Sequence, residues 1–372
     1  MGANETNGSG EALERSREKL RELARIASEA RKVLILTHDN PDPDALASAV
    51  ALRHVLKKAA RRDSVIAYGG AIGRPENRAL ARALRAGLKS CRDVDLRSYR
   101  IIALVDAQPE TGNNPLAQGL VPSIVIDHHR ARKATRLARF ADVRPDYGAT
   151  STILTEYVRA LDTPVPPRLA TALFYGIKSD TANLNRGGSE ADRRAFNHLF
   201  PYVVQSELGA VEHARVTRQH FEIMKRAIDN AIIYGDLVLS RIGSVANPEE
   251  VAAISDELIR LENMRWAVAL GVHNGDLHIS LRRGDHTRDA GQTLRRVVGR
   301  MGTAGGHGSM AGAKVPLRRA GGELEPEEIV ARVSDRLLEV LGARGREARP
   351  LVADGEGAED ADSVAPGRNA AP

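Results

Sequence analysis

One short segment of the chain gathers side chains of the types that bind metal ions. Residues 37–48 read THDNPDPDALAS and place one histidine and three aspartates within seven positions. Carboxylates held this close repel one another unless a cation neutralises them. The segment therefore suggests a cage for cations. However, Asp42 followed by Pro43 is also an ordinary helix start, with an N-cap residue before a proline at the first helical position.

Asp and His recur where other apolar runs of the chain end. The run RIIALVD (100–106) ends in an aspartate, and the run SIVIDHH (123–129) ends in one aspartate and two histidines. A further aspartate lies in GIKSDTANL, after an apolar helix. Parallel sheets bind ligands beyond the carboxyl ends of their strands, so we expect these groups to converge. The candidates are His38, Asp42, Asp44, Asp106, Asp127, His128, His129 and Asp180.

Mixed carboxylate and imidazole ligands suit Mn²⁺, with Mg²⁺, Co²⁺, Fe²⁺ or Zn²⁺ as alternatives. The number of ligands suggests two divalent ions about 3.5–4 Å apart, an arrangement that activates water for displacement at phosphorus. Simpler interpretations remain for single residues: Asp42 as a helix cap, Asp106 as a solvated strand end, and Asp127 as a turn cap or a partner of a neighbouring ring.

The elements expected to position these groups form a doubly wound parallel α/β sheet. Continuous apolar runs are typical of buried parallel strands, and here they alternate with helical patterns. The predicted strands are 32–38, 64–70, 100–106 and 123–129, and the predicted helices are 11–30, 44–60, 75–88, 151–160, 167–178 and 188–200, the last capped by Ser189.

The composition changes after a long helical stretch at 205–230. Residues 266–283 predict a hairpin around Asn274-Gly275, and residues 302–315 predict a glycine-rich loop that leads into a helix or strand. We expect a tail and helix over 1–30, an α/β domain over 31–201, a helical connector over 202–233, a smaller mixed α/β domain over 234–344 and a disordered tail over 345–372, with the active site in the cleft between the two domains.

Bulk composition excludes several classes of protein. The chain has 372 residues, a net charge of +6 and one cysteine, which excludes an internal disulfide framework and a multi-cysteine metal site. No apolar run is long enough to span a bilayer and the N-terminus has no apolar core, so we expect a cytoplasmic protein without a membrane partner. Basic residues are spread along the chain rather than clustered.

In order and spacing, HDNPDPDA, Asp106, DHH at 127–129 and SDT at 179–181 resemble the four motifs of the DHH phosphoesterases. GGHGSMAGA at 305–313 resembles the signature of the DHH-associated C-terminal domain. In its length and its compact second domain, the chain resembles the branch of oligoribonuclease/pAp phosphatases ("nanoRNases") and RecJ-like enzymes.

The resemblance assigns a role to each candidate. It implies one metal on His38 and Asp42, a second on Asp44, His128 and Asp180, and Asp106 bridging the two. His129 would act near the phosphate, Asp127 would orient an imidazole, and a metal-bound hydroxide would be the nucleophile. The substrate would contact the second domain through Arg282, Arg283, Gly305, Gly306, His307, Gly308 and Ser309. Strand alternation places the two arginines on opposite faces, and the family pattern favours Arg282.

One position departs from the family pattern. Pro43 stands where the family commonly has glycine, and proline is restricted to φ near −65°. The metal loop is intact only if this position does not require a positive φ.

We expect hydrolysis of short RNA or DNA oligonucleotides, linear dinucleotides such as pApA, or pAp. The alternatives are a pyrophosphatase of the same superfamily, a RecJ-like single-strand exonuclease and a nucleotide sensor without activity. The low aromatic content, 3%, argues against a long stacking path for single strands. The sequence leaves open whether the protein forms a homodimer.

Overall fold

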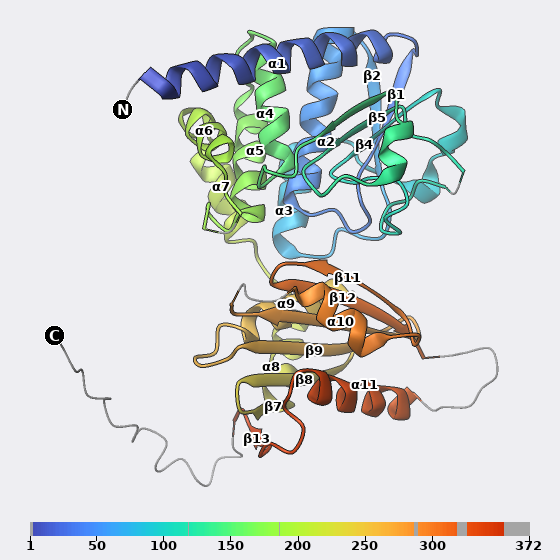
Figure 1. Ribbon diagram of the computed structural model, residues 1–372, viewed down its shortest axis with the longest axis vertical. Coiled ribbons are helices and arrows are strands. Elements are labelled where there is room, and N and C mark those ends of the chain that lie inside the picture. The colour runs from blue at the N-terminus through green and yellow to red at the C-terminus, as the bar shows by residue number, and fades with distance from the viewer. Residues whose placement is uncertain (1–2, 118, 186, 286–288, 318–325, 353–372) are drawn as a thin grey trace, which may run out of the picture. The chain divides into compact units, whose positions relative to one another are not determined.

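The computed structural model describes residues 3–117, 119–185, 187–285, 289–317 and 326–352. The chain divides into two compact units, Met1–Arg215 and Val216–Pro372. Each unit has its own sheet (Figure 1). Across the described ranges, no helix combines the length and apolar character that a membrane span requires.

The first unit is built on a six-stranded, entirely parallel sheet with the order β3-β2-β1-β4-β5-β6. The strands are β1 (Lys32–Leu36), β2 (Asp63–Tyr68), β3 (Lys89–Ser90), β4 (Ile101–Val105), β5 (Ile124–Asp127) and β6 (Phe140–Val143). From β1 the chain runs outward to β2 and β3, then returns to β4 on the other side. The predicted parallel α/β sheet is confirmed, and its topological switch point lies between β1 and β4.

Alternate residues of the central strands enter two separate cores. Val33 and Ile35 pack into the larger core with helices, whereas Leu34 and Leu36 pack into a smaller core on the opposite face. The helices of this unit are α1 (Ala3–Ala27), α2 (Pro43–Val55), α3 (Pro75–Leu84), α4 (Thr150–Ala160), α5 (Pro167–Asp180), α6 (Glu190–Leu199) and α7 (Gln205–Glu212). The smaller core is covered mainly by short 3₁₀ turns and loops between positions 91 and 120.

The second unit contains a seven-stranded mixed sheet with the order β11-β12-β10-β9-β8-β7-β13. Its strands are β7 (Ala231–Tyr234), β8 (Leu237–Ser244), β9 (Trp266–His273), β10 (Asp276–Arg283), β11 (Thr303–His307), β12 (Met310–Pro316) and β13 (Arg349–Pro350). Only the β8–β9 pair among these described strands is parallel. Its helices are α8 (Arg218–Asp229), α9 (Glu249–Leu258), α10 (Ala290–Val298) and α11 (Pro326–Val340). One core holds side chains of α8 and α9 and the other holds side chains of α10 and α11.

The turn that joins β9 and β10 confirms the predicted hairpin. Asn274 and Gly275 both adopt positive φ, 49° and 80°, which is the geometry that an Asn-Gly turn favours. Ser189 caps α6 as predicted, and its side chain forms a capping box with Asp192.

Other details differ from the expectations. The glycine-rich segment forms the β11–β12 hairpin rather than a loop, and the long helical stretch breaks into α7 and α8. The helix α1 begins at Ala3 rather than at Glu11. The first residues of the expected tail are part of the second unit, because Arg349–Pro350 pairs with β7. The rest of that tail, from 353, lies outside the described residues.

Candidate metal centre

The segment between β1 and α2 has the backbone of a capped helix start. Asp42 has an extended backbone with φ −87°, and its Oδ1 accepts a hydrogen bond from Ala45 N at 2.9 Å. Pro43 occupies the first turn of α2, so this position does not need the positive φ of a glycine. The left-handed residue of the loop is Asn40, with φ 55°. Pro43 is therefore compatible with a metal loop.

Asp44 connects α2 to α4. Its side chain is fully buried, and its two oxygens accept hydrogen bonds from Thr150 N at 2.7 Å and Ser151 N at 2.8 Å. These amides begin α4, whose own N-cap residue Ala149 has no side chain that could cap it. An anion is favoured at this helix terminus. Nevertheless, burial and the neighbouring carboxylates Asp106 and Asp180 raise the pKa of Asp44 well above its ordinary value.

Asp106 lies at the end of β4, between the ends of β1 and β5. It adopts a positive φ of 56°, which is uncommon for a residue with a side chain. Its carboxylate is only 3% exposed and accepts a hydrogen bond from Thr150 Oγ1 at 2.8 Å. Its two oxygens lie 3.5 Å from His38 Nε2 and 3.7 Å from His128 Nε2, respectively. This one carboxylate therefore approaches imidazoles from two different strands.

The Nδ1 atoms of the two histidines are tied to backbone carbonyls. His38 Nδ1 lies 2.8 Å from Asp39 O, and His128 Nδ1 lies 3.2 Å from Tyr147 O. A proton on each Nδ1 satisfies these carbonyls and leaves each Nε2 as a lone-pair donor, which is the usual arrangement of metal-binding histidines. The sequence alone gave no indication of these carbonyl partners.

The ring nitrogens face carboxylates without a full set of hydrogen bonds. His128 Nε2 is buried and lies 3.2 Å from Asp180 Oδ2, yet no aligned hydrogen bond satisfies it. Burial opposes charge on His128, but Asp180 and Asp106 outweigh it and raise its pKa well above the ordinary range. Burial likewise opposes charge on His38, and Asp106 and Asp42 raise its pKa.

A buried nitrogen of this kind among several carboxylates fits a divalent cation well. Three groups of side chains overlap at this site, and within each group the ligand atoms lie within 4.8 Å of one another. The groups are His38, Asp42 and Asp106; Asp44, His128 and Asp180; and Asp106, His128 and His129. All the metal candidates named from the sequence thus come together. Their individual roles remain predictions.

His129 is held by Asp127. Its Nδ1 lies 2.9 Å from Asp127 Oδ1, as expected for a carboxylate that orients an imidazole. Burial opposes charge on both groups, but their pairing raises the pKa of His129 and lowers that of Asp127. The His129 side chain is 41% exposed, compared with 11% for His128. His129 therefore lies at the rim of the cluster.

Gln108 was not a candidate from the sequence, because a single glutamine after a strand is an ordinary loop residue. It is 1% exposed. Its Nε2 donates to Asp127 Oδ2 at 2.6 Å and to Arg130 O at 3.2 Å, and its Oε1 accepts from Arg132 N and Thr135 Oγ1, both at 2.7 Å. One side chain thereby joins the loop after β4 to the loop that carries the histidines.

A buried ionic network supports the carbonyl that holds His128. Arg144 pairs with Asp142 at 2.7 Å and with Glu156 at 2.5 Å, and the Tyr147 hydroxyl donates to Glu156 at 2.8 Å. Ser16 of α1 donates to the same glutamate at 2.8 Å. The network fixes Tyr147, whose backbone carbonyl contacts the His128 ring.

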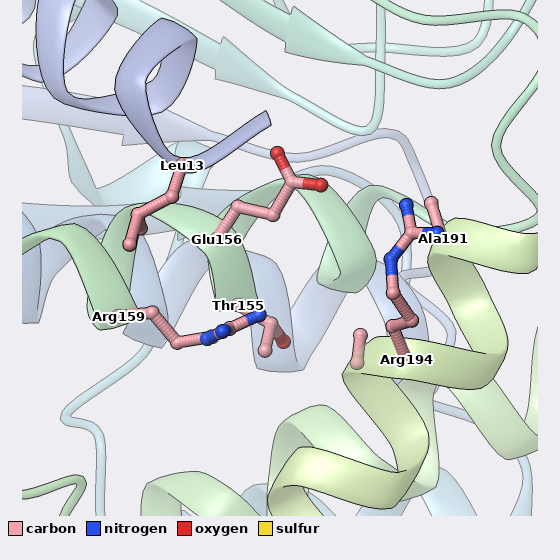
Figure 2. A pocket seen from close by; sticks show the side chains of 7 residues that line it. Leu13, Thr155, Glu156, Arg159, Ala191 and Arg194 are labelled. Atoms are coloured by element: carbon pink, nitrogen blue, oxygen red, sulfur yellow. The ribbon is translucent and has the colours of Figure 1, made fainter. Parts of the chain in front are cut away.

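The pocket in Figure 2 is a different feature. It is a small hollow, open to solvent, between α1, α4 and α6. Its lining residues are Leu13, Thr155, Glu156, Arg159, Ala191, Arg194 and Ala195. None of the metal-ligand candidates lines it.

The two arginines expected to bind substrate lie on opposite faces of β10, as alternation predicts. Arg282 donates from Nε to Asp256 at 2.5 Å on the α9 side. Arg283 stacks on Trp266, with 4.7 Å from its guanidinium carbon to the ring centroid, and pairs with Asp285 at 2.5 Å. Both arginines are buried. A contact between Arg282 and a substrate would have to compete with Asp256.

The glycine-rich residues are part of a hairpin. Gly305, Gly306 and the backbone of His307 belong to β11, whereas Gly308 and Ser309 form the turn. Gly306 has φ 138°, and a Cβ there would lie 2.4 Å from Met310 O, so its lack of a side chain has a packing reason. Gly305 faces open space. The His307 side chain lies outside the described part of the structure.

Comparison with known proteins finds relatives of the first unit and of the fold. Residues 32–177 match the DHH family, N-terminal domain. Protein MJ1633 of Methanocaldococcus jannaschii, itself uncharacterized, is 35% identical over 322 residues, which cover 85% of this chain and 65% of that protein. A probable manganese-dependent inorganic pyrophosphatase of Lactobacillus delbrueckii subsp. bulgaricus is 30% identical over 179 residues, 45% of this chain and 54% of that protein.

The chain thus spans less than two thirds of the length of each of these two relatives. Among solved structures, an exopolyphosphatase-related protein from Bacteroides fragilis shares the fold, with a TM-score of 0.65 and 15% identity over 87% of this chain and 96% of that one. Residues 32–177 therefore match the DHH family, N-terminal domain, and the chain shares its fold with the solved structure.

Proposed function

We propose that this protein is a metal-dependent phosphoesterase that hydrolyses short oligonucleotides or small nucleotide phosphoesters. The observation that carries the proposal is the position of Asp106, whose two oxygens each face a different histidine within a buried cluster of aspartates. Two ligand groups that share one carboxylate are the arrangement expected for a pair of ions, with Mn²⁺ as the first candidate. The relatives named as probable manganese-dependent pyrophosphatases support this choice of metal.

We assign the following metal-binding and phosphate-binding roles to these residues. His38, Asp42 and Asp106 would hold one ion, and Asp44, His128 and Asp180 would hold the other together with Asp106. When bound, the ions supply Lewis acidity and activate water for attack at phosphorus. Asp127 fixes the ring of His129 at the rim, where a cationic imidazole can bind a phosphate oxygen. Asp44 and Thr150 hold the cluster against the first turn of α4.

In the second unit, we propose that Arg282 and the β11–β12 hairpin contact the nucleotide, with Arg283 as the less favoured arginine. Backbone amides at Gly305 and Gly308 can approach an anion closely because no side chain intervenes. Substrate size would then depend on this unit, whereas the chemistry would depend on the first.

A pyrophosphatase is the second candidate, because the relatives with that name match about half of this chain. The two functions differ in the leaving group and in the need to contact a nucleoside. Pyrophosphate offers only charge, whereas a dinucleotide also offers a base and a sugar.

The deciding experiment is a Mn²⁺-dependent screen of pAp, pApA, short RNA, short DNA, cyclic di-AMP and pyrophosphate, followed by phosphate release and chromatography. Asp106→Ala serves as the negative control. We expect turnover of pAp or pApA that the substitution abolishes. Turnover of pyrophosphate alone would favour the second candidate, and wild-type turnover in Asp106→Ala would contradict the shared-ligand arrangement.

A further inference from the structure

The segment immediately after the two histidines is strongly basic. Residues 128–141 contain four arginines, one lysine and no acidic residue. Four of these cations, Arg130, Arg132, Lys133 and Arg136, are exposed, and we call residues 130–136 the basic segment. Although cations are spread along the chain as a whole, the fold places this group directly beside His129, at the rim of the metal-ligand cluster.

The cations of the basic segment lack the acidic partners that several other arginines of the unit have. Arg17 pairs with Asp162 and Arg168 pairs with Glu207 on the same unit's surface. Arg139, just beyond the basic segment, pairs with Glu29. Within the described ranges, by contrast, no carboxylate forms an ion pair with any of the four cations. These four side chains are therefore not engaged in ion pairs within the protein, and their charges can meet an anionic ligand.

The basic segment is anchored to the candidate metal centre. Gln108 accepts a hydrogen bond from Arg132 N and donates to Arg130 O, while its amide also holds Asp127. The following residues form a short 3₁₀ helix, Lys133–Leu137. These contacts order the backbone beside the cluster, so a ligand that binds these cations need not order the loop.

Leu137, at the end of that helix, is 67% exposed. An apolar side chain beside several cations suits a ligand that has both phosphates and bases. Linear polyphosphate would use only the cations. The combination favours an oligonucleotide.

We propose that the basic segment binds the phosphates of an oligonucleotide beyond the phosphate at the metal ligands. This inference rests on the proposed function and extends it, because it predicts that affinity grows with substrate length. We expect a dinucleotide or pAp to reach no further than Arg130, the neighbour of His129, whereas a pentanucleotide would reach Arg132, Lys133 and Arg136.

The test removes three cations and leaves Arg130, the neighbour of His129, in place. The variant is Arg132→Gln/Lys133→Gln/Arg136→Gln. A matched control, Arg31→Gln/Lys58→Gln/Arg61→Gln, removes the same charges from exposed positions before β1 and β2, at the amino ends of the strands. Both proteins are assayed with a dinucleotide and a pentanucleotide of RNA as full-length chains loaded with Mn²⁺.

For the basic-segment variant, we expect KM for the pentanucleotide to rise roughly tenfold, with kcat nearly unchanged, because surface ion contacts are individually weak but add up. The slope of log affinity against log salt should fall by about 2, as three contacts to a single strand imply. The dinucleotide should be hydrolysed as by the wild type, and the control variant should behave as the wild type with both substrates. An equal rise in KM for the dinucleotide and the pentanucleotide, or no rise for either substrate, would overturn the proposal.

Binding separates this inference from the proposed function. Fluorescence anisotropy of a labelled pentanucleotide on the metal-free protein should show weaker, less salt-dependent binding by the basic-segment variant even if no oligonucleotide is hydrolysed. That result would support phosphate binding by the basic segment even if the proposed hydrolysis were refuted. Binding of linear polyphosphate that depends on the basic segment, without such binding of the pentanucleotide, would refute the oligonucleotide as its ligand.

Discussion

Metal loading should reverse the stability order of wild type and Asp106→Asn. Asparagine keeps the shape of the side chain and an oxygen for the bond from Thr150 Oγ1. It removes one charge from a buried cluster in which Asp44 and Asp180 already have raised pKa values through burial and mutual repulsion. Without metal, the variant should therefore be at least as stable as the wild type. With metal it should be less stable, because a shared ligand is lost.

The size of the effect follows from linkage. One ion at a hundred times its Kd stabilises the folded state by about 2.7 kcal/mol, so two independent ions contribute about 5.4 kcal/mol. For a unit of about 200 residues, each kcal/mol raises Tm by roughly 2–4 °C. Saturating Mn²⁺ should raise the wild-type Tm of the first unit by roughly 11–22 °C, and that of Asp106→Asn by less than half as much.

Calorimetry of the full chain in EDTA and in MnCl₂ measures both values, and the metal-sensitive transition identifies the first unit. Asp93→Asn, at an exposed position outside the cluster, is the matched control and should shift like the wild type. An equal Mn²⁺ shift in Asp106→Asn would refute a shared ligand. A metal-free Tm several degrees below that of the wild type would refute the repulsion argument.

Three further substitutions test the support of the site. Arg144→Met should destabilise by about 3–5 kcal/mol in urea titrations at pH 7, because it strands buried carboxylates. Burial alone would raise the pKa of Asp142, but Arg144 lowers it below its ordinary value. Its contribution to wild-type stability is present above the ordinary pKa of about 3.9 and is lost as pH falls through the lower folded pKa, so the stability deficit of the variant should shrink only below that pH. Gln108→Met should lower kcat at least tenfold with a smaller change in Tm, and an unchanged kcat would contradict its positioning role. Gly176→Ala would place a Cβ 2.4 Å from Ser151 Oγ and should lower Tm, an effect absent if the helices simply shift apart.

The buried strands were predictable because physics leaves few alternatives for them. Continuous apolar runs such as 32–38 and 100–106 must be covered on both faces, and their spacing with helices dictates a parallel sheet. The short strands β3 and β6 have no such run, so pairing alone reveals them. The β11–β12 hairpin was missed because its glycines have low strand propensity, and tertiary packing against Met310 and Ala311 overrides it.

The convergence of His38, Asp106 and His128 was predictable because strand ends of a parallel sheet meet at one edge. Asp44 and Asp180 reach the same place from helices α2 and α5. The groups that hold these ligands in place could not be predicted, because they are backbone groups or common polar residues. Tyr147 contributes a carbonyl and Thr150 contributes an amide. Gln108 acts through four hydrogen-bond partners that only the fold brings together. The basic segment escaped notice for a related reason, since unpaired cations are recognised only when the positions of the carboxylates are known.

The loop before α2 takes its conformation from the residues of the chain itself. Asn40 supplies the left-handed turn, Asp42 caps the helix and Pro43 restricts the backbone at its first turn. Exchange of one divalent cation for another should therefore require no refolding of this loop. Selection among cations would then depend on their supply in the cell as much as on the ligands. The metal content of protein purified from cultures grown with different trace metals should follow the growth medium.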